Sequence, residues 1–332
     1  MIRPSTWEVA RINLVPACSL LATAVIVLWG TSRPPGAPNP HILKMMYKPG
    51  EVEACRMVWA IALAAQSAAF LLAIATFGWA LLKGAGSDSD QQRLAISSGV
   101  IVFIVIGYLL YDRLLQGPNL PSVLLTLAMV PDVAGPNATT VCWEAARMQF
   151  AQRSFNFIDV ENILAAVVII GGTLATGAVI VDLSQRDEWP ADKHAQARAL
   201  TCQIARFRLL LSVSAGALVV GVIQILTEFR WATSKLAGES AQAMAGLPSS
   251  IAVTAGGCFS LGLFAVFLTG AAILRNYVEA FTDKAFQPET DGPDRTEWQK
   301  KMGLSLPFAN LYDFAKISLP LLTGLASIPL KS

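Results

Sequence analysis

Six long stretches of apolar residues run through this chain, and no charged residue lies in the middle of any of them. A helix rises about 1.5 Å per residue, so about 20 apolar residues cross a hydrocarbon layer about 30 Å thick. Only a helix satisfies its own backbone hydrogen bonds in lipid. The sequence therefore predicts an all-α fold, a polytopic transmembrane bundle. Its six spanning helices cover about residues 12–29, 57–82, 94–110, 163–181, 209–226 and 250–274.

The composition agrees with a chain that is mostly in contact with lipid. Hydrophobic residues make up 54% and charged residues 14%, and the mean hydropathy is +0.52. Soluble domains average about 25% charged residues. The net charge of +2, with its basic residues spread over the loops, argues against a nucleic-acid partner. We expect one bundle over residues 1–282, a tail over residues 283–332, and the lipid bilayer as the main partner.

The loops and the aromatic residues predict an orientation. If the N-terminus is inside, most of the 25 Lys and Arg residues fall in cytoplasmic segments, the usual side for basic residues. Trp59 and Trp79 bracket the second stretch, and Trp231 follows the outer end of the fifth. Indole rings prefer the two membrane interfaces. We expect a multi-pass protein of a bacterial inner membrane, the plasma membrane, with both termini cytoplasmic.

Two external loops are long. Residues 31–56 are rich in proline, which predicts an extended, irregular segment. Residues 112–157 are too many for a structureless loop, so we expect this loop to be partly helical. Its apolar part, residues 119–130, either lies on the membrane surface or enters it as a re-entrant segment, and residues 141–153 read as a helix.

The tail carries a narrow polar stripe. Asn310, Asp313 and Lys316 are spaced at i, i+3 and i+6 among apolar residues. This pattern predicts an amphipathic helix at the membrane interface, with ordinary packing under the bundle as the alternative. A seventh spanning helix over residues 304–330 is disfavoured, because Pro320 would kink it and the Asp313–Lys316 pair would lie at depth.

Cysteine and histidine give little sign of chemistry. Cys55 and Cys142 both fall in external loops, an oxidising location, and form either a disulfide or two free thiols. His41 and His194 lie on opposite sides of the membrane in this topology, so they cannot share a metal ion. The chain contains no recognised metal, phosphate-binding or catalytic spacing. We therefore expect no metal, no cofactor and no catalytic residues.

A few polar residues remain as candidates for function. Gln66 and Gln224 are the deepest polar groups, and they either line a narrow path or hydrogen-bond between helices, a contact of about 0.6–2 kcal/mol. Asp159, Glu161 and Glu228 lie near the outer ends of the fourth and fifth helices. In an oligomer these carboxylates form a ring that attracts cations. The alternative is that they are solvated charges at the interface.

Small residues recur at helical spacing in the last two helices. Ser212 and Gly216 form one small-xxx-small pair, and Gly256 and Ser260 form another. Such pairs let helix backbones approach closely in lipid, where no hydrophobic force drives association. They mark either contacts inside the bundle or the contact between subunits of an oligomer.

The leading functional hypothesis is a non-enzymatic channel or facilitator for a small solute or ion, assembled as a homo-oligomer. The alternative is a structural or assembly subunit that binds other membrane subunits. A third hypothesis is a lipid-modifying membrane enzyme, for which Asp159 and Asp182 are the acidic candidates. None of these residues forms a catalytic spacing, so the enzyme has the lowest weight.

Overall fold

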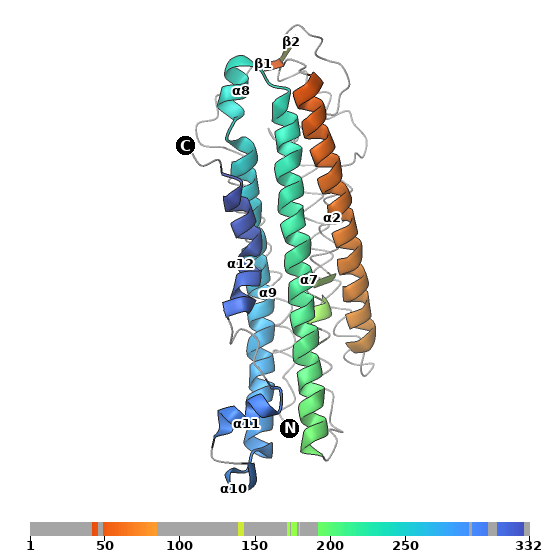
Figure 1. The fold of residues 1–332 in the computed structure, drawn as a ribbon, viewed down its shortest axis with the longest axis vertical. Helices are drawn as coiled ribbons and strands as arrows, with labels where there is room; N and C mark the ends of the chain where they lie inside the picture. Colours follow the sequence, from red (N-terminus) through yellow and green to blue (C-terminus); the bar gives the residue numbers. More distant parts are fainter. Residues whose placement is uncertain are drawn as a thin grey trace.

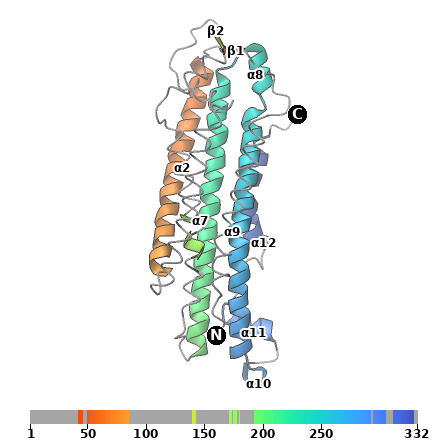
Figure 2. The ribbon, with the colours of Figure 1, turned by 180° about the vertical axis from the view of Figure 1, so that it is seen from behind.

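The computed structural model of the protein is dominated by three long helices that run side by side (Figure 1). They are α2 (Pro49–Gly84), α7 (Lys193–Ser234) and α9 (Leu247–Ala285). Figure 2, the reverse view, shows the same lengthwise arrangement. The structure describes residues 42–45, 49–84, 139–142, 171–172, 174–177, 179, 192–291, 294–304 and 311–328.

Within the described residues, three helical segments are long and apolar enough to cross a membrane, namely Gly50–Ala80, Lys193–Ser234 and Gly238–Ala285. They contain the fifth and sixth stretches predicted from sequence and nearly all of the second, which confirms membrane-type helices there. The fourth stretch is helical at its described residues within 171–179. The first and third stretches lie outside the described residues.

Helix α2 contacts α7 along a seam with a seven-residue period. Val52, Trp59, Gln66, Ala73 and Ala80 recur at this spacing, and all are buried or half-buried. A seven-residue period keeps one side of a helix against its neighbour, as in a left-handed coiled coil. The helix begins at Pro49, inside the segment expected to be irregular, so the seam reaches beyond the apolar stretch.

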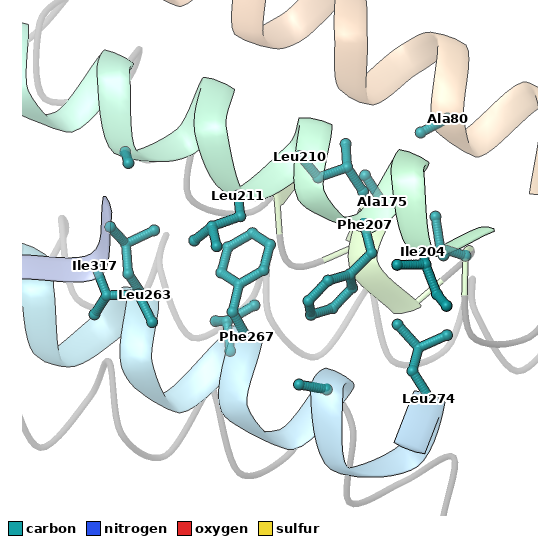
Figure 3. Packing of buried hydrophobic residues seen from close by; sticks show 14 of the residues in the cluster. Ala80, Ala175, Ile204, Phe207, Leu210, Leu211, Leu263, Phe267, Leu274 and Ile317 are labelled. Atoms are coloured by element: carbon teal, nitrogen blue, oxygen red, sulfur yellow. The ribbon is translucent and has the colours of Figure 1, made fainter. Parts of the chain in front are cut away.

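Helices α7 and α9 pack through interlocking side chains. The rings of Phe207 and Phe267 meet edge to face, with centroids 5.3 Å apart (Figure 3). Such a pair contributes about 0.5–1.5 kcal/mol beyond the area it buries. This core is extended along the bundle by Leu211 of α7, Leu263 of α9 and Ile317 of α12 (Figure 3).

Helix α12 (Leu311–Ala326) lies antiparallel along α9. The Ser249 hydroxyl donates to the Ser327 carbonyl at 2.9 Å. One turn further along α9, a β-carbon on Gly324 would lie 2.6 Å from the carbonyl oxygen of Ala252. The backbones of the two helices are therefore in direct contact, and the end of α12 lies beside the start of α9.

This place differs from the interfacial position that the polar stripe of the tail predicts. Pro320 removes one backbone donor from α12, and the next amide, that of Leu321, donates to Ser260 Oγ at 3.1 Å. A hydroxyl on a neighbouring helix thus accepts from the backbone where the proline disturbs it, as is common inside membrane bundles. Gly256 and Ser260 serve a contact within the chain, the first of the two expected roles.

A small cap covers the lower end of α9 in Figure 1, formed by α10 (Pro288–Asp291) and α11 (Arg295–Lys301). Trp298 is buried there against Phe281 and Phe286, with ring centroids 6.0 and 5.7 Å away. The cap is also tied to α7, because Lys193 Nζ donates to Asp291 Oδ1 at 2.8 Å.

The opposite end carries α8 (Gly238–Met244) and a short antiparallel pair of strands, β1 (Ile42–Met45) and β2 (Thr139–Cys142). Ile42 pairs with Cys142 and Met45 with Thr139. The expected helix over residues 141–153 is therefore wrong at its start. The run of β-branched residues at 139–141 favours a strand, and it adds a small β element to a fold expected to be all-α.

Candidate functional site

The candidate site is a group of buried polar side chains between α2 and α7, toward the α8 end of the bundle. Three of the residues predicted from sequence, Gln66, Gln224 and Glu228, lie in this part of the helix pair. Asp159 and Glu161 lie outside the described residues, as does Asp182. We call Gln66, Gln224, Thr227 and Glu228 the polar cluster.

The α7 side of the polar cluster is held by hydrogen bonds along one face of the helix. Gln224 Nε2 donates to Glu228 Oε2 at 2.9 Å, across the i to i+4 spacing. Thr227 Oγ1 donates to the Gln224 carbonyl at 2.9 Å. Glu228 is only 4% exposed and Gln224 1%. The carboxylate is thus fixed against the helix that carries it.

The α2 side is Gln66, which is 6% exposed. Its Nε2 would lie 3.9 Å from a β-carbon on Gly221, and Phe259 Cε2 of α9 is at the same distance from that point. Because Gly221 has no side chain, the Gln66 carboxamide can lie against the surface of α7. Gln66 therefore lies one helical turn from Gln224 along α7.

Two stacked tryptophans lie on the α8 side of the polar cluster. The rings of Trp59 and Trp231 have centroids 4.8 Å apart and an interplanar angle of 24°. Lys235 Nζ lies 5.8 Å from the centroid of Trp231. Trp59 precedes Gln66 by two turns of α2, and the buried residue between them is the small Ala62. Along the two helices, the polar cluster thus lies between an aromatic pair and the Gln66–Gly221 contact.

Two acceptor atoms of the polar cluster have no hydrogen-bond donor among the described residues. Gln66 Oε1 and Glu228 Oε1 are both buried and accept no hydrogen bond, and the Trp231 Nε1 donor also has no acceptor. Burying an ionised carboxylate without a counter-charge is very costly. The arrangement is suited to bind a cation or a proton, which would bring the missing charge.

Burial of Glu228 corrects one of the two readings of the sequence. A solvated interface charge is expected if the fifth helix ends near residue 226, but α7 continues to Ser234. The extra two turns carry Phe229, Trp231 and Ala232, all buried, so this part of α7 is covered and not solvated. Sequence reasoning ends the helix too early because polar residues interrupt its apolar run.

A second polar group, which the sequence did not reveal as one, joins α7 to α12 in the part of the bundle toward the α10–α11 cap. Asp313 Oδ2 lies 3.6 Å from Arg208 Nε, and Lys316 Nζ donates to Ser212 Oγ at 2.8 Å. Both α12 residues belong to the predicted polar stripe. Their partners on α7, Arg208 and Ser212, are spaced at i and i+4. A comparison of the polar stripes on the two helices could therefore have predicted this contact.

The same end carries the aromatic residue predicted to mark the inner interface. The guanidinium carbon of Arg206 lies 5.5 Å from the centroid of Trp79. Since Trp59 meets Trp231 at the other end, these two contacts align α2 and α7 antiparallel over the whole distance between the tryptophans.

The predicted disulfide is not tested by the described side chains. Cys55 is half-buried on α2. Cys142 ends β2, and its side chain lies outside the described residues. The bond between them stays a prediction.

Known proteins add nothing to this geometry. No family model matches the chain, and neither a curated protein nor a solved structure is significantly similar to it. Within the described part of the chain, no three His, Cys, Asp or Glu residues lie close enough to hold a metal ion.

Proposed function

We propose that this protein is an integral membrane protein whose helix bundle gives a small solute or ion a path across the bilayer. The observation that supports this function is the polar cluster, a carboxylate and two carboxamides buried between helices of membrane-spanning length. Ionisable groups inside membrane bundles are costly, and they most often mark ion or substrate pathways.

The arrangement of the polar cluster suits a narrow path. Gln66 and Glu228 come from neighbouring helices, and each keeps one oxygen without a hydrogen-bond donor. From Trp59 to Gln66, the helix advances about 10 Å, at 1.5 Å per residue. Polar oxygens along such a segment can replace part of the hydration shell of a passing ion.

Flux through reconstituted liposomes tests the function. Release of Na⁺, K⁺ or H⁺ and swelling in glycerol are measured with the purified full chain and with empty liposomes. Glu228→Gln and Gln66→Leu are expected to reduce the flux severalfold. Glu239→Gln, which changes an exposed carboxylate on α8 at the same end of the bundle, is the matched control. Liposomes that stay tight to all four species contradict the proposal.

The proposed orientation keeps the six predicted spanning helices in a bacterial inner membrane, adds α12 as a further crossing, and places the α10–α11 cap in the cytoplasm. Basic residues near that end, including Arg198, Lys284 and Lys300, support this side. Helix α12 then runs from the cytoplasmic side toward the outside, since its end lies beside Ser249. This revises the expected topology, because it puts the end of α12 and the cap on opposite sides.

One observation favours the alternative function, a structural or assembly subunit. Only 22% of the most apolar part of α2 is buried, against 50% for α7. Large side chains on α2, including Met57, Ile61 and Leu71, are more than half exposed. This face contacts either lipid or another subunit. Mass measurement in native detergent separates a homo-oligomer from a complex with other proteins, and a tight liposome together with a co-purifying subunit favours the alternative.

A further inference from the structure

We propose that Glu228 and Gln66 form a binding site for one small monovalent cation, at which Na⁺ and H⁺ compete. The inference deepens the proposed function, on which it rests for its biological role, by naming the ion. Binding itself is measured without transport, so the two proposals can fail separately.

The first argument is the unmatched oxygen atoms. Glu228 Oε2 accepts from Gln224, whereas Glu228 Oε1 and Gln66 Oε1 accept from no donor, although both residues are more than nine-tenths buried. Carboxylate and amide oxygens are ligands of hard cations. A bound cation gives both oxygens a partner and neutralises the carboxylate.

The second argument is the position of the neighbouring charges. On α2, Arg56 pairs with Glu53 at 2.6 Å on the exposed surface. On α7, Arg230 is exposed and Lys235 lies over Trp231. Helix α8 adds only the exposed acidic Glu239, and the charged residues of α9 are confined to its far end, from residue 275 onward.

None of these basic groups forms an ion pair with Glu228 in the described part of the chain. The residue's hydrogen bond there comes from the neutral Gln224. Among the described residues the carboxylate therefore has no counter-charge, and in this proposal an exchangeable cation supplies it.

The third argument limits the size and charge of the occupant. Along α2 and α7, the stacked Trp59 and Trp231 rings flank the polar cluster on one side, and the Gln66–Gly221 contact flanks it on the other. Calcium takes six to eight oxygen ligands, usually from several carboxylates. The described residues offer one carboxylate and no acidic group of three. A single small monovalent cation fits this donor set better than a divalent one.

Carbodiimide labelling tests the site directly. A hydrophobic carbodiimide reacts with a protonated carboxyl group: the acid proton moves to a carbodiimide nitrogen, and the carboxylate oxygen bonds to the central carbon. The full chain in detergent is labelled at constant pH and ionic strength in NaCl or choline chloride. Peptide mass mapping then gives the rate at Glu228.

We expect Na⁺ to slow the labelling of Glu228 and choline to leave it unchanged. At a Na⁺ concentration ten times the dissociation constant, the rate falls about elevenfold, because the unoccupied fraction falls as 1 + [L]/Kd. Gln66→Leu removes one ligand oxygen and shifts protection to higher Na⁺ concentration. Ser67→Ala, at the neighbouring exposed position, is the matched control and keeps wild-type protection. Unchanged elution and melting temperature show that each variant is folded.

Each outcome decides the proposal. Equal labelling in NaCl and choline chloride overturns the Na⁺ site, and absence of labelling at every pH overturns the exchangeable carboxyl. Wild-type protection in Gln66→Leu removes Gln66 from the site. Protection by Na⁺ in a protein that leaves liposomes tight keeps the site and overturns the transport function. Flux without protection keeps transport and overturns this inference.

Discussion

The carbonyl oxygen of Pro320 lies against the α-carbon of Gly256, so that α12 and α9 touch through their backbones with no side chain between them. A β-carbon on Gly256 would overlap that oxygen and lie 3.2 Å from the α-carbon of Leu321. Gly324 meets Ala252 in the same way one turn along α12. In lipid, such close packing replaces the hydrophobic force as the source of helix association.

Gly256→Ala is therefore expected to destabilise the bundle by about 1–3 kcal/mol, because the opposing backbone cannot rotate away as a side chain does. The midpoint of thermal unfolding in detergent measures the effect. Gly257→Ala is the matched control: its β-carbon would contact only Leu321 Cδ1, at 3.8 Å, and should change the midpoint little. Equal effects of the two substitutions contradict the close contact.

The pattern of α9 was readable from sequence, but the partner of its small residues was not. The Gly256–Ser260 spacing indicates a close neighbour in either the same or another chain. The choice depends on where α12 lies, and Pro320 argued against a place inside the bundle. The hydroxyl that accepts the Leu321 amide belongs to Ser260, 61 residues away. Local patterns carry no information about such distant compensation.

The position of α12 makes a prediction about the sides of the membrane. Its end lies beside Ser249, at the α8 end of the bundle. Cys202 is exposed on α7 near the opposite end. It follows Thr201, whose hydroxyl donates to the Met302 carbonyl at 3.3 Å. In a chain otherwise free of cysteine, a cysteine appended after Ser332 should react with an impermeant maleimide from the same side as Glu239→Cys. A variant that retains only Cys202 should react from the other side.

Labelling of the appended cysteine and Cys202 from one side contradicts a crossing by α12. In that case, the contacts with α9 would form at depth without a full traverse. Permeabilised membranes, in which all three cysteines react, are the control for accessibility.

The candidate site was predicted in its residues but not in its geometry. Gln66 and Gln224 stand out because they are polar within apolar runs. The sequence places Glu228 beyond the end of the fifth helix, whereas the structure has it inside α7. Packing of the buried Phe229 and Trp231, rather than local hydropathy, extends α7 beyond residue 226. The space over Gly221 follows from contact with α2, which no single-helix pattern shows.

The ion pair between Arg208 and Asp313 should contribute to stability because it is largely buried. The Asp313 side chain is 3% exposed and that of Arg208 30%. Removing one partner of a fully buried pair costs about 3–5 kcal/mol, and partial solvation of Arg208 reduces this to about 1–3 kcal/mol for Asp313→Asn. The measurement is the free energy of unfolding in detergent with increasing denaturant.

Glu279→Gln is the matched control for that variant. Glu279 accepts from Arg275 Nε at 2.7 Å, but both side chains are exposed, so the loss should stay below about 1 kcal/mol. Equal losses from the two substitutions are inconsistent with a buried contact between α7 and α12.

The tether between α7 and the cap should depend on acid pH. The pKa of Asp291 is lowered below its usual value of 3.8, mainly by its hydrogen bond from the Lys193 ammonium and, to a smaller degree, by the one from the backbone amide of Gln287. A lowered pKa means that the folded state favours the ionised carboxyl. The contribution is therefore complete above about pH 4, the ordinary pKa of the group, and is lost as the pH falls through the lowered value.

Hydrogen exchange of the Gln287 amide, which donates to Asp291 Oδ2 at 3.0 Å, measures this tether. At pH 6, Asp291→Asn should exchange faster than the wild type, because the neutral side chain neither pairs with Lys193 nor accepts the amide as strongly. Glu289→Gln, an exposed change in the same helix, should not. Once pH-dependent intrinsic exchange is corrected, the difference between wild type and Asp291→Asn should vanish below the lowered pKa, where both side chains are neutral. If the difference in exchange rate persists below that pKa, the packing of the side chain, and not the charge on Asp291, protects the amide.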